Sequence, residues 1–327
     1  MEKDDNTPYK FYLSVTNLSN IWGITPQAII QYFGEDKQDL QKIGKAYRIY
    51  PNDMIAIREK RKLPNSKHKI FCTHVTKGGV GKTMATHGLS CFASMLGYKT
   101  LVIDLDMQAD LTSSFGIKPV PNETKTILNA FTKENTIQEC VVQINPFLHL
   151  IPASMSLTKF DMHLKTTNTN SQTLFKRLIS PIEMDYDFIF IDCPPSLNAV
   201  TSAAQLYSDV LLMPTELEEF AVQNLEYSFD NLASLSEQYE VKCSPKIFLS
   251  KVDGRLTSFF DYFESLNASY GDLVCKNYIS ASTEVKKALK NKKFLWEVKA
   301  KTSVLEDISN LFFEITELNE WRNKRVQ

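Results

Sequence analysis

Short apolar runs alternate with amphipathic segments along most of the chain, beginning near residue 70. Runs of this length that are rich in β-branched and aromatic residues predict buried strands. They lie at 69–75, 99–106, 148–153, 186–195, 208–214, 245–253 and 276–280. Continuous apolar strands separated by helices are typical of a parallel sheet that is covered on both faces. The sequence therefore predicts an α/β fold in which a mostly parallel sheet is flanked by helices.

The first 64 residues carry a different pattern, with shorter helices and one hairpin. Two helices are expected to begin at the N-caps Thr16 and Thr25, and the first is expected to end at Gly23. Two short helices this close together indicate a helix-turn-helix. A hairpin over residues 42–50 and a third helix over residues 51–64 are predicted to follow.

This change of pattern divides the chain into parts that also differ in charge. We expect a disordered tail (residues 1–9), a winged helix-turn-helix domain (10–64), a polar linker (65–69) and the α/β domain (70–327). Residues 1–70 hold 12 Lys and Arg against 8 Asp and Glu, a net +4, and the remainder holds 25 against 30, a net −5. The basic excess lies in the N-terminal part, so the overall charge does not argue for nucleic-acid binding, whereas local charge can.

The C-terminal segment has apolar residues at helical spacing from Val304 to Trp321. Such a helix can pack into a core or lie on a membrane surface. Its polar face carries acidic residues such as Glu306 and Glu314, which an anionic membrane would repel. We therefore expect this helix to pack on the core, and we expect no membrane partner.

The composition excludes several classes of protein. The chain is 43% hydrophobic and 23% charged, which suits a globular protein with a sizeable core. Its longest apolar runs are too short to cross a bilayer, and its polar start does not match a secretory signal. The six cysteines are scattered, with no C-x-x-C pair. This pattern indicates buried thiols of a cytoplasmic protein and argues against a disulfide framework or a metal cluster.

A candidate phosphate-binding loop lies in THVTKGGVGKTMATHG, residues 73–88, between a predicted strand and a predicted helix. Backbone N–H groups of such a loop, together with the helix N-terminus, bind phosphate oxygens. Lys82 is expected to reach the β- and γ-phosphates, and the Thr83 hydroxyl to bind Mg²⁺. Thr76 stands where the pattern G-x-x-x-x-G-K-S/T has its first glycine. The remaining expected contacts are the backbone groups of Gly78, Gly79, Val80 and Gly81.

Acidic side chains follow two of the predicted strands. Asp104 and Asp106 end the strand in LVIDLDMQAD, and Asp192 ends the strand in YDFIFIDCPPS. Ligands of such sheets bind at the carboxyl ends of the strands. A carboxylate at this edge can hold a water for attack on a phosphate, or can hold Mg²⁺ through water. We therefore expect Thr83, Asp106 and Asp192 to form the metal site.

Three blocks in this order, KGGVGKT, DLDMQ and IDCPPS, resemble the ParA-type partition ATPases, relatives of MinD with a deviant Walker A motif. The resemblance covers roughly residues 69–320 and includes the shorter blocks LIPASMSL, DVLLMPTELEEFAVQNL and KVDGR. It implies a homodimer that hydrolyses ATP with Mg²⁺. Members lack the first glycine, so Thr76 fits the family.

The resemblance also implies roles for individual residues. The family's signature lysine, matched by Lys77, crosses to the nucleotide of the other subunit, where it would stabilise charge on the transferred phosphoryl group. Asp106 would orient the attacking water. The expected catalytic residues are thus Lys77, Lys82 and Asp106. Met84 departs from the family's usual Thr or Ser, and its backbone N–H would still reach the α-phosphate.

The block LSKVDG, residues 249–254, resembles the guanine-specifying motif N-K-x-D, with Ser250 in place of Asn. The aspartate of that motif accepts hydrogen bonds from guanine N–H groups that adenine lacks. The alternative is a strand followed by a polar turn. ParA-type proteins carry an Asp and an Arg here, matched by Asp253 and Arg255, and use ATP. We therefore expect ATP, with Ser250 and Lys251 beside the nucleotide.

Two regions are candidates for DNA binding. The N-terminal segment resembles the winged helix-turn-helix of MerR-type proteins and of larger plasmid ParA proteins, and it is expected to bind an operator. Its expected contacts are Gln27 and Gln31 in the recognition helix and Lys42, Lys45 and Arg48 at the wing. The alternative is a small helical cap that serves only dimerisation.

The second candidate is the lysine-rich stretch ISASTEVKKALKNKKF, which resembles the region that binds DNA non-specifically in partition ATPases. Its expected contacts are Lys286, Lys287 and Lys290. The alternative is a solvated run of charge.

The resemblance implies partition of a plasmid or chromosome at the nucleoid, with a ParB-type centromere-binding protein that stimulates hydrolysis, and the N-terminal domain suggests autorepression. Two other functions stay open: a MinD-like positioning ATPase and a transcriptional regulator that only senses nucleotide. An iron–sulfur reductase component would share the loop, but the sequence lacks suitably paired cysteines.

Overall fold

The structure is a computed structural model. It describes residues 12–33, 42–43, 46–60, 65, 67–217, 221–253, 259–290 and 303–318. Expectations for the tail at residues 1–9, for Lys45, for Arg255 and for the lysines beyond residue 290 lie outside these residues.

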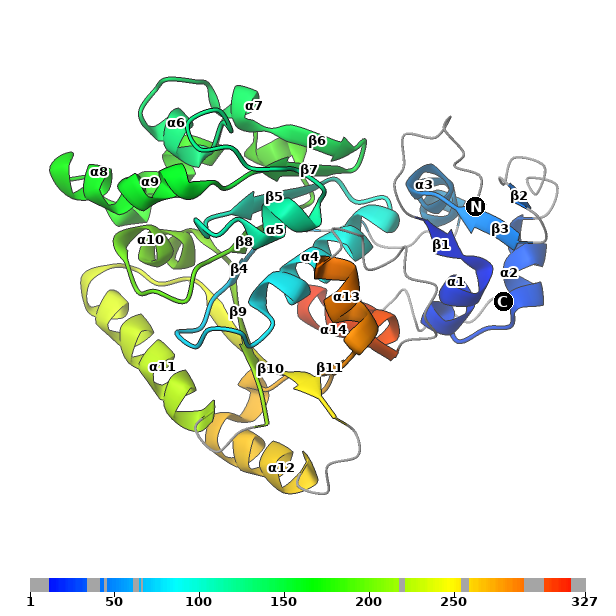
Figure 1. Ribbon diagram of the computed structural model, residues 1–327. Helices are drawn as coiled ribbons and strands as arrows, with labels where there is room; N and C mark the ends of the chain where they lie inside the picture. Colours follow the sequence, from blue (N-terminus) through cyan, green and yellow to red (C-terminus); the bar gives the residue numbers. More distant parts are fainter. Residues whose placement is uncertain are drawn as a thin grey trace.

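An eight-stranded sheet forms the centre of the molecule, in the order β11-β10-β9-β4-β8-β5-β7-β6 (Figure 1). Its strands are β4 (Lys69–Thr73), β5 (Thr100–Asp104), β6 (Val142–Asn145), β7 (Leu148–Ile151), β8 (Phe188–Asp192), β9 (Val210–Thr215), β10 (Ser244–Val252) and β11 (Ile279–Ser280). All neighbours pair in parallel except β6, which is antiparallel to β7. The predicted parallel sheet and its seven strands are confirmed.

The edge strand β6 was not predicted. Its sequence, VQIN, is short, and its first two side chains are exposed. It therefore lacks the continuous apolar run on which the prediction of buried strands depends.

Side chains of the central strands alternate between two apolar cores, one on each face of the sheet. Phe71, Phe188 and Phe190 belong to the first core, whereas their neighbours Ile189 and Ile191 belong to the second. This alternation follows from the two-residue period of a strand. Because both faces are buried, the strands are apolar throughout, which is why they were visible in the sequence.

Helices cover both faces of the sheet (Figure 1). The first core is closed by α4 (Lys82–Met95), α5 (Asp110–Ser114), α13 (Thr283–Lys290) and α14 (Ser303–Thr316). The second is closed by α6 (Ile127–Phe131), α7 (Ile137–Cys140), α8 (Phe160–Thr166), α9 (Ser171–Ile179), α10 (Ala199–Tyr207), α11 (Ala221–Gln238) and α12 (Phe259–Tyr270).

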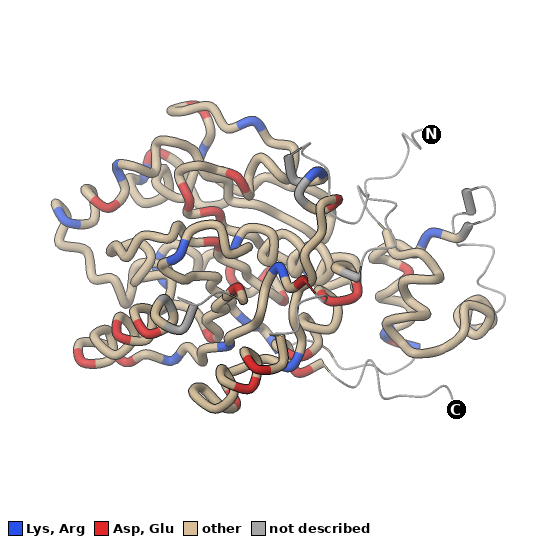
Figure 2. Tube along the Cα trace, turned by 60° about the horizontal axis from the view of Figure 1, so that its bottom comes forward, with Lys and Arg blue, Asp and Glu red and all other residues tan. Residues whose placement is uncertain are grey.

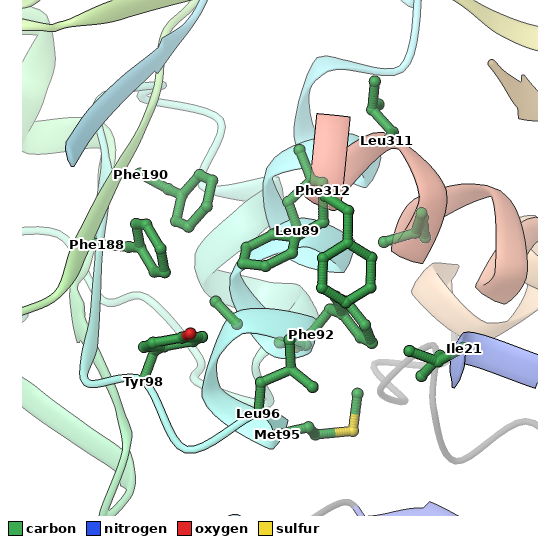
Figure 3. Close-up of a cluster of buried hydrophobic side chains, with 14 of the residues drawn as sticks. Ile21, Leu89, Phe92, Met95, Leu96, Tyr98, Phe188, Phe190, Leu311 and Phe312 are labelled. Carbon is green, nitrogen blue, oxygen red and sulfur yellow. The ribbon is translucent and has the colours of Figure 1, made fainter. Parts of the chain in front are cut away.

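The C-terminal helix α14 packs in the first core, as predicted. Figure 3 shows Phe312 of α14 in one apolar cluster with Phe92 of α4 and Phe188 of the sheet. The ring centroids of Phe312 lie 5.2 Å from Phe92 and 5.6 Å from Phe188, both with edge-on geometry. The apolar face of α14 is thus buried in the first core. Among the described residues, no helix is long and apolar enough to span a membrane.

The N-terminal segment contains the predicted helices and hairpin. The helices are α1 (Val15–Trp22), α2 (Pro26–Phe33) and α3 (Pro51–Lys60), and the hairpin consists of β2 (Lys42–Ile43) and β3 (Ala46–Ile49). A further strand, β1 (Leu13–Ser14), was not predicted and gives an antiparallel sheet in the order β1-β3-β2. Thr25 caps α2, since its Oγ1 accepts from the Ala28 N–H at 3.2 Å. The cap predicted at Thr16 is wrong. Ser14 fills that position, with its Oγ accepting from the Asn17 N–H at 3.0 Å.

The N-terminal segment packs directly on the end of α4. Gly97 follows α4 with φ +80°, and a Cβ at this position would lie 2.8 Å from Ile55 Cγ1 and 2.9 Å from the Pro51 carbonyl oxygen. The Arg58 guanidinium lies 4.8 Å from the centre of the Tyr98 ring, within the range of a cation–π contact. Helix α3 therefore requires a glycine at residue 97, and the two parts of the chain share one core.

His87, in the middle of α4, gives the fold a pH dependence. It is fully buried, contacts Ser114 Oγ through Nδ1 at 2.7 Å and stacks on Phe115. Burial lowers its pKa to about 3, whereas an unfolded chain has a histidine pKa of about 6.5. As the pH falls below that value, the unfolded state binds a proton that the folded state does not. Stability is therefore lost between about pH 6.5 and pH 3.

We predict that His87→Gln makes the protein less sensitive to acid. Between about pH 7 and pH 5 the wild type should lose about 2 kcal/mol more unfolding free energy than the variant. Urea unfolding at several pH values measures this difference. The buried His74 is present in both proteins, so its contribution cancels. Equal losses in the two proteins would show that His87 does not carry the effect.

Candidate functional site

The glycine-rich loop connects β4 to α4 and ends at Gly81, the N-cap of the helix. Lys82 is buried, and its ammonium donates to the carbonyl oxygens of Val75, at 3.2 Å, and Lys77, at 2.7 Å. Burial lowers the pKa of Lys82, and the carboxylates of Asp192 and Asp106 oppose this shift. The loop thus folds around the ammonium group that was predicted to contact phosphates.

Gly81 is fixed by two constraints, its backbone and its neighbour. Its φ of +93° is in the left-handed region, which side chains disfavour. A Cβ here would also lie 2.5 Å from Ser250 Oγ at the end of β10, and 3.7 Å from Ser250 Cβ. Ser250 is buried, and its hydroxyl has no hydrogen-bond partner among the described residues. The predicted residue Ser250 therefore lies against the loop.

Thr83 and Asp192, two residues of the predicted metal site, contact each other at the edge of the sheet. Thr83 Oγ1 donates to Asp192 Oδ2 at 2.8 Å, and Thr86 Oγ1 lies 3.3 Å from Asp192 Oδ1. Burial and the neighbouring Asp104 raise the pKa of Asp192 well above its usual range. A cation at this position would favour the ionised carboxylate.

The two aspartates after β5 lie in different environments. Asp104 is fully buried and accepts from the N–H and hydroxyl of Thr112, at 2.9 and 2.7 Å, so it holds the start of α5. Burial raises its pKa to about 7. Asp106 is half-buried, and its Oδ1 accepts from the Gln108 N–H at 3.0 Å. Asp106 is therefore the more accessible carboxylate for a reacting group.

The donors at this edge fit Mg²⁺ rather than a metal held by protein alone. Among the described residues, no three His, Cys, Asp or Glu side chains form a group that could hold a metal ion. Mg²⁺ prefers oxygen ligands and usually keeps several waters, with one or two carboxylates and substrate phosphates. Thr83, Asp192 and the half-buried Asp106 supply that kind of donor set.

Lys251, at the end of β10, reaches across to the loop. Its ammonium donates to the Gly79 carbonyl oxygen and forms an ion pair with Glu216 Oε1 at 2.5 Å. The sequence predicted Lys251 near the nucleotide but gave no sign of Glu216, which follows β9.

A second group that the sequence did not reveal is a chain of polar side chains behind the loop, in which His74 and Gln205 are buried and Asn231 is half-buried. His74 Nδ1 contacts Gln205 Nε2 at 3.0 Å, and Gln205 Oε1 accepts from Asn231 Nδ2 at 3.0 Å. Burial, with the charge of Lys82, lowers the pKa of His74 to about 4. The chain connects the loop to α10 and α11. Its members are far apart in sequence, so no local pattern indicated it.

The remaining loop residues lie as follows. Val80 and Met84 are buried, Gly78 and Gly79 are exposed, and Lys77 is half-buried. Lys77 contributes its backbone to the loop, since its carbonyl oxygen accepts a hydrogen bond from the Lys82 ammonium.

The predicted DNA contacts are distributed over two separate surfaces. Gln27 and Gln31 are both exposed on α2, one helical turn apart. Arg48 instead packs over the Tyr12 ring, at 4.5 Å from its centre. Lys42 lies in β2, and only its backbone is described.

In α13, Lys287 is exposed, while Lys286 and Lys290 are described only by their backbone. Figure 2 shows basic and acidic positions interspersed along the part of the chain that the structure describes.

Comparison with known proteins shows which family this chain belongs to. The AAA_31 family, described as an AAA domain, matches residues 68–244, more than half of the chain. The chain is 31% identical over 194 residues to the chromosome partitioning protein ParA of Myxococcus xanthus, covering 59% of this chain and 65% of that protein. It thus spans slightly less than two thirds of that relative.

The chain is also similar to a second curated protein and to a solved structure. The chain is 26% identical over 221 residues to the sporulation initiation inhibitor protein Soj of Bacillus subtilis, covering 67% of this chain and 87% of that protein. The solved structure of apo McdA from Cyanothece superposes with a TM-score of 0.67 at 22% identity, covering 77% of this chain and 99% of that one. At this identity the structural likeness shows the fold alone.

We predict that Gly81→Ala destabilises the protein by about 2 kcal/mol, through backbone strain and the clash with Ser250 Oγ. Adding Ser250→Ala should recover part of this loss, because only the more distant Cβ remains. Gly78→Ala is the matched control, since nothing lies within 4 Å of its Cβ position. Thermal or urea unfolding measures all four proteins. A double variant no more stable than Gly81→Ala would exclude the clash.

Proposed function

We propose that this chain is a DNA partition ATPase. The chain belongs to the AAA_31 family of AAA domains and is a P-loop ATPase of the ParA/MinD type. It would hydrolyse ATP with Mg²⁺, dimerise around the bound nucleotides and bind DNA as the dimer. The observation that carries the proposal is the meeting of Lys82, Thr83 and Asp192 at the carboxyl edge of β4 and β8.

Phosphate binding would replace contacts that the loop now makes with itself. The Lys82 ammonium is held by two backbone carbonyls, and phosphate oxygens are stronger acceptors because they are charged. The N-terminus of α4 adds backbone N–H groups and its partial positive charge. Thr83, Asp192 and Asp106 would hold Mg²⁺, which supplies positive charge that stabilises the phosphates during transfer.

Asp106 would accept the proton of the attacking water or orient it, since it is the half-buried carboxylate at this edge. Asp104 is unsuited to that role, because its oxygens already accept hydrogen bonds from Thr112 and from the Asp106 N–H. Lys77 would act on the nucleotide of the partner subunit, where a second ammonium stabilises the charge of the transition state.

Exposed apolar side chains beside the catalytic residues support dimerisation through this edge. Met107 directly follows Asp106 and is 40% exposed, and Leu197 lies five residues after Asp192 and is 46% exposed. Apolar side chains that flank a charged site would be covered by a second subunit seated on the nucleotide.

DNA would be bound by the dimer in two ways. The exposed Gln27 and Gln31 on α2 suit contacts with an operator, which would make the protein an autorepressor. The lysines of α13 suit sequence-independent contacts with phosphates. A ParB-type partner would stimulate hydrolysis, and the protein would act in the cytoplasm on the nucleoid.

The proposal is tested by size-exclusion chromatography with light scattering in ATP, ADP and a slowly hydrolysed ATP analogue, combined with measurement of phosphate release with and without DNA. We expect a dimer with ATP or its analogue, and turnover that DNA raises. Absence of turnover under all these conditions would instead support a regulator that only senses nucleotide.

We predict that Lys77→Ala keeps nucleotide binding within about threefold of the wild type but lowers turnover about a hundredfold or more. ATP-dependent dimerisation should be lost, because the contact with the partner's nucleotide is removed. Lys118→Ala, at an exposed lysine that is not part of the glycine-rich loop, is the control. A Lys77→Ala protein that still forms the ATP dimer would contradict this role.

We predict that Asp106→Ala binds ATP and dimerises but hydrolyses ATP about a hundredfold more slowly, because the water loses its carboxylate. Phosphate release under single-turnover conditions measures the step directly. Asp110→Ala removes a nearby exposed carboxylate and should leave the rate unchanged. Equal turnover in wild type and Asp106→Ala would exclude Asp106 from the chemical step.

A further inference from the structure

Lys251, the last but one residue of strand β10, adopts an unusual backbone conformation. Its φ of +56° is in the left-handed region, which residues with a side chain seldom adopt. Strained residues of this kind persist where the surrounding structure holds them, and they cluster at functional sites. The conformation coincides with an irregularity in the pairing of β10 with β11, between Ser250 and Val252. Irregularities of this kind redirect a side chain, and the Lys251 side chain makes a specific contact here.

The contact is the bridge from the Lys251 ammonium to the Gly79 carbonyl oxygen and to Glu216 Oε1. Both charged side chains are largely withdrawn from solvent, at 32% exposure for Lys251 and 19% for Glu216. The bridge joins three parts of the sheet edge: the end of β10, the end of β9 and the glycine-rich loop. Ser250, the preceding residue, lies against Gly81 of the same loop.

The bridge fixes the direction of one peptide group in the loop. In a trans peptide the carbonyl and the following N–H point in opposite directions. Because Lys251 holds the Gly79 carbonyl, the Val80 N–H must point away from Lys251. Gly79 is in the left-handed region, has open space around it and would otherwise rotate readily. A loop that binds phosphates through N–H groups gains affinity when those groups are oriented beforehand.

We propose that Lys251 is a positioning residue for the phosphate-binding loop. Its ammonium orients the Gly79–Val80 peptide before the nucleotide arrives, and Glu216 holds the ammonium in place. The proposal rests on the proposed function only in taking the phosphates of ATP as the loop's ligand. It differs from a direct contact between Lys251 and the nucleotide, because the effect is present in the free protein.

The first test measures the loop without any nucleotide. Hydrogen–deuterium exchange of the peptide that contains residues 76–83 should be faster in Lys251→Met than in the wild type. The control is Lys246→Met, which removes a lysine of the same strand whose ammonium contacts the Asp272 carbonyl instead. Equal loop exchange in wild type and Lys251→Met would overturn the proposal, whatever the protein's ligand is.

The second test separates positioning from a merely structural role. Affinity for a fluorescent ADP analogue should fall about tenfold in Lys251→Met and in Lys251→Gly, the size expected for one hydrogen bond from a charged group. Lys251→Gly removes the backbone strain, so its melting temperature should match or exceed that of the wild type. A structural role predicts a lower melting temperature in the same variant. Lys251→Arg keeps the charge and should recover most of the affinity.

A double-mutant cycle tests the role of Glu216. Glu216→Gln should weaken binding by a few-fold in the wild type and have little further effect in Lys251→Met. Additive effects would show that Glu216 does not act through Lys251. If the wild type bound no adenine nucleotide at all, the proposed function would fail, while the exchange experiment would still decide the role of Lys251.

Discussion

The structure depends on the burial of helix α4 between the sheet and the C-terminal helix. From Met84 onward, every residue of the helix is buried. Its glycine at residue 88 lets α14 approach so closely that a Cβ there would lie 2.5 Å from Ile308 Cδ1. The first residue of this helix is Lys82, and Thr83 follows. The two residues that we propose to bind phosphate and Mg²⁺ are therefore held by the same packing that stabilises the domain, and they have little freedom to move independently of it.

The parts of the fold and of the site that could be predicted from the sequence are those whose pattern lies within one continuous stretch of the chain. The buried strands and the loop were visible because each is a continuous stretch with its own pattern, and the acidic residues could be placed because parallel strands end at one edge. The cap at Ser14 was misplaced by two residues, a usual error at helix ends. Strand β6 was missed because its outward residues are polar or exposed.

The rest of the site could not be predicted, because it depends on pairs that meet only in the folded chain. Glu216 and Lys251 are 35 residues apart, and His74 and Gln205 are 131 apart. Lys251 was expected near the nucleotide through a motif, but its bond to the Gly79 carbonyl depends on how β10 ends beside the loop. The left-handed backbone at Lys251 was equally invisible, since lysine carries no preference for it.

The contact between Gly97 and helix α3 bears on how the chain can be divided. The N-terminal segment looks like a module that could be removed at the polar stretch near residue 65. Its removal would uncover the end of α4, including Tyr98, whose ring is wholly buried beneath Arg58 and its neighbours. The shortened protein would present an apolar surface to water, which favours self-association. The N-terminal segment thus also covers an apolar surface of the larger domain. Measurements on a truncated protein would therefore be affected by its self-association.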